Sequence, residues 1–116
     1  MNWDISGLIA LTGETRGIVA ISMKTETALE ITRILTGKTH SYLDSDVVDM
    51  IGELVNIISG NVKKNLEDTY KIIISLPYII RGRAHLVVIP EERSRLLCIP
   101  FKIFIDQGLC LSISID

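Results

Sequence analysis

The sequence predicts an α+β fold in which a mostly antiparallel β-sheet carries one long helix and a shorter helix packed on it. Strand-like and helix-like segments come in blocks along the chain rather than in strict alternation, which is typical of this class. The chain has 116 residues, enough for one domain, so we expect a single domain over residues 1–116. Twenty isoleucines and only 5% aromatic residues predict an aliphatic core.

The first segments are expected to form a β-hairpin followed by the shorter helix. Apolar residues alternate with small or polar ones from Ile5 to Thr12, and after a glycine-bounded turn the strand returns from Ile18 to Met23. Thr25 is a suitable N-cap for a helix that extends to Thr36. Gly37 then supplies the left-handed residue that commonly ends a helix.

The long helix is predicted to run from Ser45 to Leu66, with Asp44 as its N-cap. At about 100° per residue, one side of this helix is apolar and must face the sheet. That side comprises Val47, Ile51, Leu54, Ile58 and Val62. The opposite side is a polar stripe formed by Asp49, Glu53, Asn56 and Gly60.

The remainder of the chain is strand-like. We expect strands over residues 70–76, 84–89, 96–105 and 109–115, with a hairpin turn at residues 106–108. If Ile105 pairs with Leu109 across that turn, Cys110 lies opposite Phe104.

A solvated surface is the simplest interpretation of the polar stripe, but the composition of the long helix favours a functional one. Gly52 and Gly60 lie inside the helix, where each costs about 1 kcal/mol relative to alanine. Both leave space beside Asn56 through which another backbone could approach, although helix–helix packing would also explain them. Apolar side chains border the stripe at Met50 and Ile57.

Composition excludes several classes of function. A net charge of −2 and few aromatic residues argue against a nucleic-acid partner. No apolar run is long enough to span a membrane, and the N-terminus lacks the features of a signal peptide, so we expect a cytoplasmic protein. His40 and His85 are 45 residues apart without neighbouring carboxylates at metal-site spacing, so no metal ligands are assigned. No nucleophile elbow or phosphate-binding loop is present.

The segment Asp49-Met-Ile-Gly-Glu53-Leu-Val-Asn56, followed later by Pro77, resembles the Asp/Ser-x3-Glu-x2-Asn…Pro signature of the CheC/CheX/FliY phosphatases of bacterial chemotaxis. The segments from Ile5 to Gly17 and from Ile74 to Gly82 resemble CheX in particular. The shorter helix carries no second Glu-x-x-Asn motif, as in CheX and unlike CheC.

The resemblance implies an enzyme that hydrolyses the aspartyl phosphate of a chemotaxis response regulator, phospho-CheY. By this resemblance Asn56 would position the attacking water, and Glu53 would contact the active-site lysine of the regulator. The surrounding residues Asp49, Met50, Gly52, Ile57 and Gly60 would contact the partner. The regulator would supply Mg²⁺, so the chain would need no cofactor of its own.

The resemblance also leads to an expectation about the start of the chain. CheX-like chains normally begin with another helix, whereas this sequence begins at the first hairpin, as a truncated or a natural short form would. The flank of the long helix around Val48, Val55 and Leu66 would then be uncovered. The homodimer through sheet edges that the family implies would cover some of this surface.

Two other classes of function remain open at this point. A non-enzymatic docking module could use the same stripe to bind a response regulator or a component of the flagellar switch. The Glu53 and Asn56 pair favours the enzyme, because a docking surface has no need of both. A metabolic enzyme finds no support, because no cluster of acid, base and nucleophile is evident.

Overall fold

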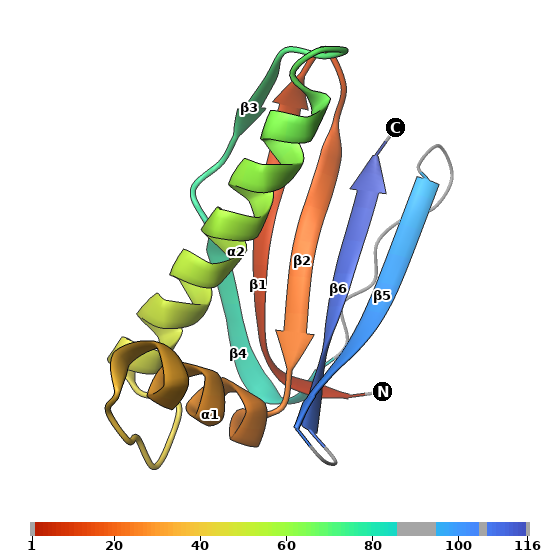
Figure 1. Ribbon diagram of the computed structural model, residues 1–116. Helices are drawn as coiled ribbons and strands as arrows, with labels where there is room; N and C mark the ends of the chain where they lie inside the picture. The colour runs from red at the N-terminus through yellow and green to blue at the C-terminus, as the bar shows by residue number, and fades with distance from the viewer. Residues whose placement is uncertain (1, 86–94, 105–106, 116) are drawn as a thin grey trace.

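The computed structural model describes residues 2–85, 95–104 and 107–115. In these ranges the chain forms six strands and two helices (Figure 1). In chain order these are β1 (Trp3–Gly13), β2 (Gly17–Met23), α1 (Thr25–Thr36), α2 (Ser45–Leu66), β3 (Ile72–Ile74), β4 (Tyr78–His85), β5 (Arg95–Phe104) and β6 (Gln107–Ile115).

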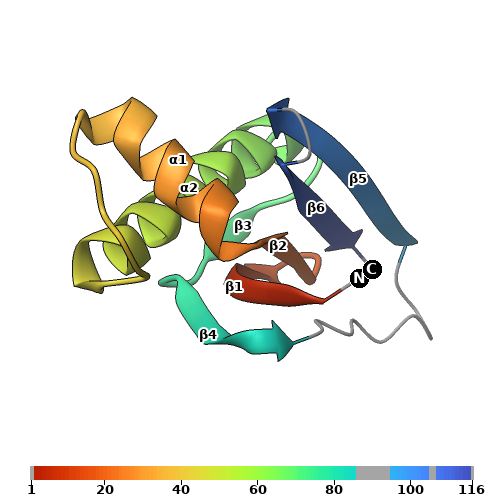
Figure 2. The same cartoon turned by 90° about the horizontal axis from the view of Figure 1, so that it is seen from below.

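The strands form one sheet in the order β3-β1-β2-β6-β5, and β4 pairs with β1 on the same edge as β3. Every pairing in the described part of the chain is antiparallel. Both helices cover the same face of the sheet (Figures 1 and 2), with α2 lying along β1 and α1 across its end. The predicted α+β class and the two predicted helices are therefore confirmed.

Both β3 and β4 pair with β1 along the same edge of the sheet, and the segment around Pro77 interrupts this pairing. Leu11 pairs with Ile74 of β3, and Leu8 pairs with Tyr78 of β4. Between them Ser75 replaces the regular ladder, because its N–H donates to the Ala10 carbonyl (3.0 Å) and its hydroxyl accepts the Ala10 N–H (2.9 Å). The break therefore leaves the backbone of Ala10 hydrogen-bonded, as a strand interior requires.

This arrangement corrects two of the expected strands. The strand expected over residues 70–76 is shorter, because β3 covers only Ile72–Ile74. The strand expected over residues 84–89 begins earlier, because β4 covers Tyr78–His85 and includes the first two residues of that range. Residues 86–89 lie outside the described part of the chain.

The core lies between the helices and the sheet. Alternate residues of β1 and β2 point toward the helices and meet one face of α2, as expected for strands with one covered face. Its buried members in the described residues are aliphatic or methionine, as the composition predicts: Ile5, Ile9, Leu11, Val19, Ile21, Met23, Ala28, Ile31, Val47, Ile51, Val55 and Ile72.

The two helices begin in different ways. Asp44 caps α2 as predicted, because its Oδ1 accepts the Val47 N–H at 3.0 Å. The residue before α1 is Lys24, which makes no side-chain cap, so the prediction that Thr25 caps this helix is wrong. Asp4 of β1 acts instead, since its Oδ2 accepts both the N–H and the hydroxyl of Thr25, at 2.9 and 3.0 Å.

The packing of α2 corrects the expectation of an uncovered flank. Val55 is fully buried, and a Cβ added to Gly7 of β1 would lie 3.2 Å from its Cγ1. Glycine at position 7 therefore lets β1 come close enough to cover Val55. Val48 and Leu66 are partly buried against the same core.

The pairing of β5 with β6 differs from the expected register. Cys110 lies opposite Pro100, not opposite Phe104. The register also shifts by one residue between Lys102 and Phe104, which marks a local irregularity in this strand pair. The hairpin turn expected at residues 106–108 is wrong in part, because Gln107 and Gly108 belong to β6. Residues 105 and 106 lie outside the described part of the chain.

Candidate functional site

The exposed side of α2 carries the residues that the sequence singled out. Asp49, Glu53 and Asn56 are exposed, and Gly60 is partly exposed, so together they form a surface that we call the α2 ridge. Glu53 and Asn56 are three residues apart, which places them side by side on one helical face. Neither side chain makes a hydrogen bond or ion pair with another described residue. Both functional groups are thus available to a partner.

Pro77 packs against α2 at Gly52, one helical turn before Asn56, and so borders the ridge on that side. A Cβ added to Gly52 would lie 3.7 Å from Cγ of Pro77 and 3.8 Å from Cδ1 of Ile79. The proline that follows the motif in sequence is therefore in reach of the helix turn that bears Glu53 and Asn56. This contact gives a physical reason for its place in the motif, because a rigid ring holds the segment between β3 and β4 against α2.

Gly52 itself departs from the expectation. It is buried beneath Pro77 and Ile79, so the expectation that it forms part of the surface that meets a partner is wrong in this structure. Sequence reasoning misplaced it because the covering segment lies 25 residues farther along the chain. Gly60 has no atom within 4 Å of an added Cβ and remains open to an approaching backbone.

Apolar side chains border the ridge on both sides. Ile57 is 55% exposed and Met50 is partly buried, and helical spacing places both on one flank of the ridge. On the opposite flank Leu76, beside Pro77, is 85% exposed. Exposed large apolar side chains around a few uncommitted polar groups are typical of a protein-binding surface. Sequence reasoning identified Met50 and Ile57, but Leu76 required knowledge of where Pro77 packs.

The charges along α2 are unevenly distributed. Asp46, Asp49 and Glu53 are exposed in the first half of the helix, and Lys63 and Lys64 lie in its last turn. This order is favourable for the helix dipole. It also gives the half of the ridge around Glu53 a negative character, so that a basic group on a partner would be attracted there.

The ridge has limited chemical capacity of its own. An amide and a carboxylate can hold a water and a cationic group in place, but neither is a strong nucleophile. The arrangement suits a reaction in which the substrate is already reactive and only orientation is needed.

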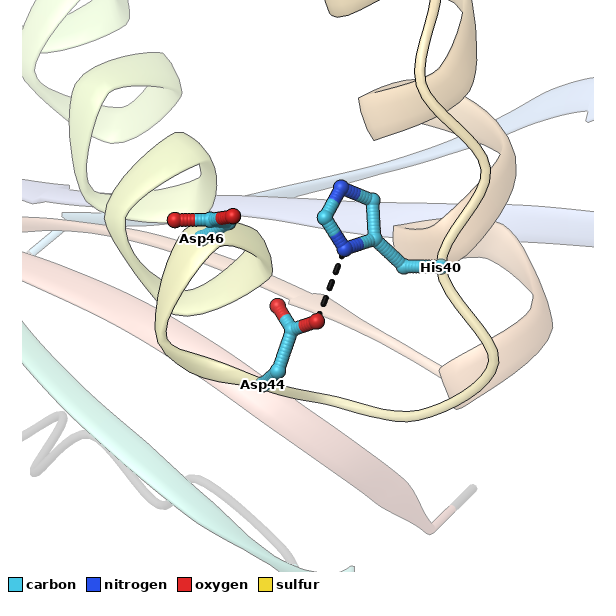
Figure 3. Close-up of side chains that lie close together, drawn as sticks. All are labelled: His40, Asp44 and Asp46. Atoms are coloured by element: carbon cyan, nitrogen blue, oxygen red, sulfur yellow. Dashed lines mark hydrogen bonds and ion pairs between the residues drawn. The ribbon is translucent and has the colours of Figure 1, made fainter.

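A second cluster, which sequence reasoning missed, lies at the start of α2. His40, Asp44 and Asp46 place their ligand-type atoms within 4.8 Å of one another (Figure 3). His40 Nδ1 lies 2.7 Å from Asp44 Oδ2. The pKa of Asp44 is lowered mainly by the hydrogen bond from the Val47 N–H and next by the hydrogen bond with His40. The spacing His-x3-Asp-x-Asp in the sequence is the signal that could have predicted the cluster, whereas the separation of the two histidines does not indicate it.

A separate open cavity of about 690 Å³ lies between the start of α1, the α1–α2 loop and β4. Its lining includes Asp4, Tyr42, Arg81 and Arg83 and contains neither Glu53 nor Asn56. Within the described ranges, neither helix has the length and apolar character needed to cross a membrane.

Comparison with known proteins gives consistent results. Residues 5–102 match the family model described as chemotaxis phosphatase CheX. The CheY-P phosphatase CheX of Thermotoga maritima is 27% identical over 110 residues, which cover 93% of this chain and 69% of that protein.

Solved structures resemble the whole fold. Chemotaxis protein CheX from Vibrio vulnificus has a TM-score of 0.90 and 28% identity, covering 100% of this chain and 77% of its own. The CheX–CheY–BeF3–Mg²⁺ complex from Borrelia burgdorferi has a TM-score of 0.85 and 26% identity, covering 97% and 75%. Since the family model spans most of the chain and the fold agrees throughout, the chain belongs to the CheX family of chemotaxis phosphatases.

Proposed function

We propose that this protein removes the phosphoryl group from the active-site aspartate of a CheY-type response regulator, using Glu53 and Asn56. The observation that carries the proposal is the pairing of these two exposed, uncommitted side chains on the α2 ridge beside Pro77. Family membership and a relative that forms a complex with CheY support the identity of the partner.

The chemistry fits the residue types. An aspartyl phosphate is a reactive acyl phosphate, and Mg²⁺ held by the regulator would neutralise charge that develops on the phosphoryl oxygens. What remains is to hold a water in line with the scissile P–O bond. The Asn56 carboxamide can accept from and donate to that water, and its neutral amide needs no shifted pKa for this task.

Glu53 would serve a different purpose. Its carboxylate lies in the negative half of the ridge, where it can accept hydrogen bonds from an ammonium group. We propose that it pairs with the active-site lysine of the regulator and thereby aligns Asn56 with the phosphoryl group. Asp49 would contribute at the rim, while Ile57 and Gly60 would allow close contact with the loops of the regulator.

The decisive experiment measures phosphate release from a Mg²⁺-loaded, phosphorylated CheY at substoichiometric amounts of this protein. The Asn56→Ala variant is expected to lose at least about 100-fold in the accelerated rate while its melting temperature is retained, because Asn56 is exposed and makes no hydrogen bond with another described residue. Asn65→Ala is the matched control, since it removes another exposed asparagine near the end of the same helix. Full activity in Asn56→Ala would contradict the mechanism.

Glu53→Gln separates alignment from the water-holding step. It keeps the size of the side chain and removes the charge, so we expect KM for phospho-CheY to rise by about tenfold, the equivalent of one charge-assisted hydrogen bond. A wild-type protein that binds phospho-CheY without shortening the lifetime of its phosphate would instead be a docking module.

We also propose a homodimer through the edge of the sheet formed by β3 and β4. Ile73, Tyr78 and Ile80 are large apolar side chains exposed on this edge, and no other described strand pairs with its outer side. Sedimentation analysis should show a dimer that Ile80→Lys converts to a monomer. A monomeric wild-type protein at micromolar concentration would contradict this assembly.

A further inference from the structure

The cluster at the start of α2 has a composition that its structural role does not require. The cap hydrogen bond from the Val47 N–H goes to Asp44 Oδ1. His40 is 90% buried, with 10% of its side chain exposed, and it directs Nδ1 at the other oxygen of Asp44. Asp46 extends from the first turn of α2 toward the same point (Figure 3). An imidazole and two carboxylates therefore converge where a cap needs one carboxylate.

We propose that His40, Asp44 and Asp46 bind a divalent transition-metal ion of the zinc class. Ligands of a tetrahedral zinc at 2.0–2.2 Å stand about 3.4 Å from one another. The present atoms lie within 4.8 Å of one another, with the His40 and Asp44 pair at 2.7 Å. Side-chain adjustments of about 1 Å are enough to reach that geometry, and Asp46 is exposed and able to make them.

Charge and backbone support the same conclusion. Two carboxylates with a neutral imidazole balance the charge of a divalent ion, and they offset the repulsion between the ion and the positive end of the α2 dipole. Arg81 Nη1 of β4 donates to the Leu43 carbonyl at 2.8 Å, which holds the end of the α1–α2 loop, next to Asp44, against β4. The Asp44 cap itself fixes one ligand. Two of the three ligands are therefore positioned before the ion arrives.

The ligand types select the class of ion. Imidazole suits Zn²⁺, Co²⁺ and Ni²⁺, whereas Mg²⁺ and Ca²⁺ prefer sites composed only of oxygen ligands. Three protein ligands leave one coordination position for water. The site is separate from Glu53, which lies seven residues after Asp46 and therefore about 10 Å farther along the helix axis. It is also distinct from the Mg²⁺ that the proposed phosphatase reaction would draw from the regulator.

The test is a calorimetric titration of the metal-free full chain with Zn²⁺ in the presence of millimolar Mg²⁺. We expect one Zn²⁺ per chain, and at least about tenfold weaker binding in both His40→Gln and Asp46→Asn. Asp49→Asn is the matched control, because it removes one exposed carboxylate from the same helix outside the cluster. Its affinity for Zn²⁺ should remain close to that of the wild type.

Two further measurements keep the proposal open to refutation. Zn²⁺ should raise the melting temperature of the wild type and of Asp49→Asn but not of Asp46→Asn, which also reports that the variant folds. Substitution with Co²⁺ should give a spectrum without a thiolate charge-transfer band. Equal binding by all the variants, or a thiolate band from the cysteines, would overturn the assignment.

Discussion

The two sides of α2 differ in burial and in the contacts that their residues make. On the inner side Val47, Ile51 and Val55 are fully buried against the sheet, and even Gly52 is covered by Pro77. On the outer side Glu53 and Asn56 contact no described residue through a hydrogen bond or ion pair. Folding therefore explains the buried aliphatic residues of the inner side and requires neither Glu53 nor Asn56. Residues that the fold does not need are the ones available for recognition and chemistry.

The largest expected effect tests this contrast with one residue type. Ile51→Ala should lower the free energy of unfolding by about 2–5 kcal/mol, because the side chain is fully buried and its removal leaves a cavity. Ile57→Ala, six residues on and 55% exposed, should change it by less than about 0.5 kcal/mol. Urea denaturation measures both. Similar losses in the two variants would show that the outer side is also structural.

The two glycines of α2 allow the same substitution to be compared on the inner and the outer side of the helix. Both Gly52→Ala and Gly60→Ala should raise the free energy of unfolding by about 0.5–1 kcal/mol, since alanine is the better helix former and neither new methyl group meets an atom closer than 3.7 Å. Only Gly60→Ala should impair phosphatase activity, through a higher KM. An equal loss of activity in Gly52→Ala would mean that the inner side also meets the partner.

Ser59 is an exception among the buried residues of the inner side, because its side chain is polar. Its buried hydroxyl has no hydrogen-bond partner among the described residues, so Ser59→Ala should stabilise the protein by about 0.5–1 kcal/mol. Thr32→Val in α1 is the contrasting variant, because it removes a buried hydroxyl that donates to the Ala28 carbonyl at 2.8 Å. It should destabilise by a similar amount in thermal unfolding. A loss of stability in Ser59→Ala would indicate a contact with another group.

Local signals allowed the sequence to predict some elements well. The limits of α2 are as predicted, because Asp44 lies next to the turn that it caps and the apolar spacing continues to Leu66. The αL conformation of Gly37 likewise depends on one residue, with φ at 75°. The exposure of Glu53 and Asn56 could be predicted for the same reason, since it follows from helical spacing.

The errors arise where distant segments decide the structure. Asp4 caps α1 across 21 residues, and the segment that buries Gly52 is 25 residues away. The position of β4 depends on its pairing with β1, and its own glycine and arginines gave no strand pattern. No short window of sequence contains this information.

The carboxylate of Asp4 has a consequence for how the chain folds. It joins three segments, because Oδ2 accepts from Thr25 at the start of α1 while Oδ1 accepts from the Ala84 N–H of β4 at 3.4 Å. The first turn of α1 thus lacks its cap until β1 has taken its place. We expect α1 to form late, after the hairpin of β1 and β2, with kinetic φ-values near zero at its first turn. In this order of assembly, the sheet completes the helix, and the helix then closes over the core.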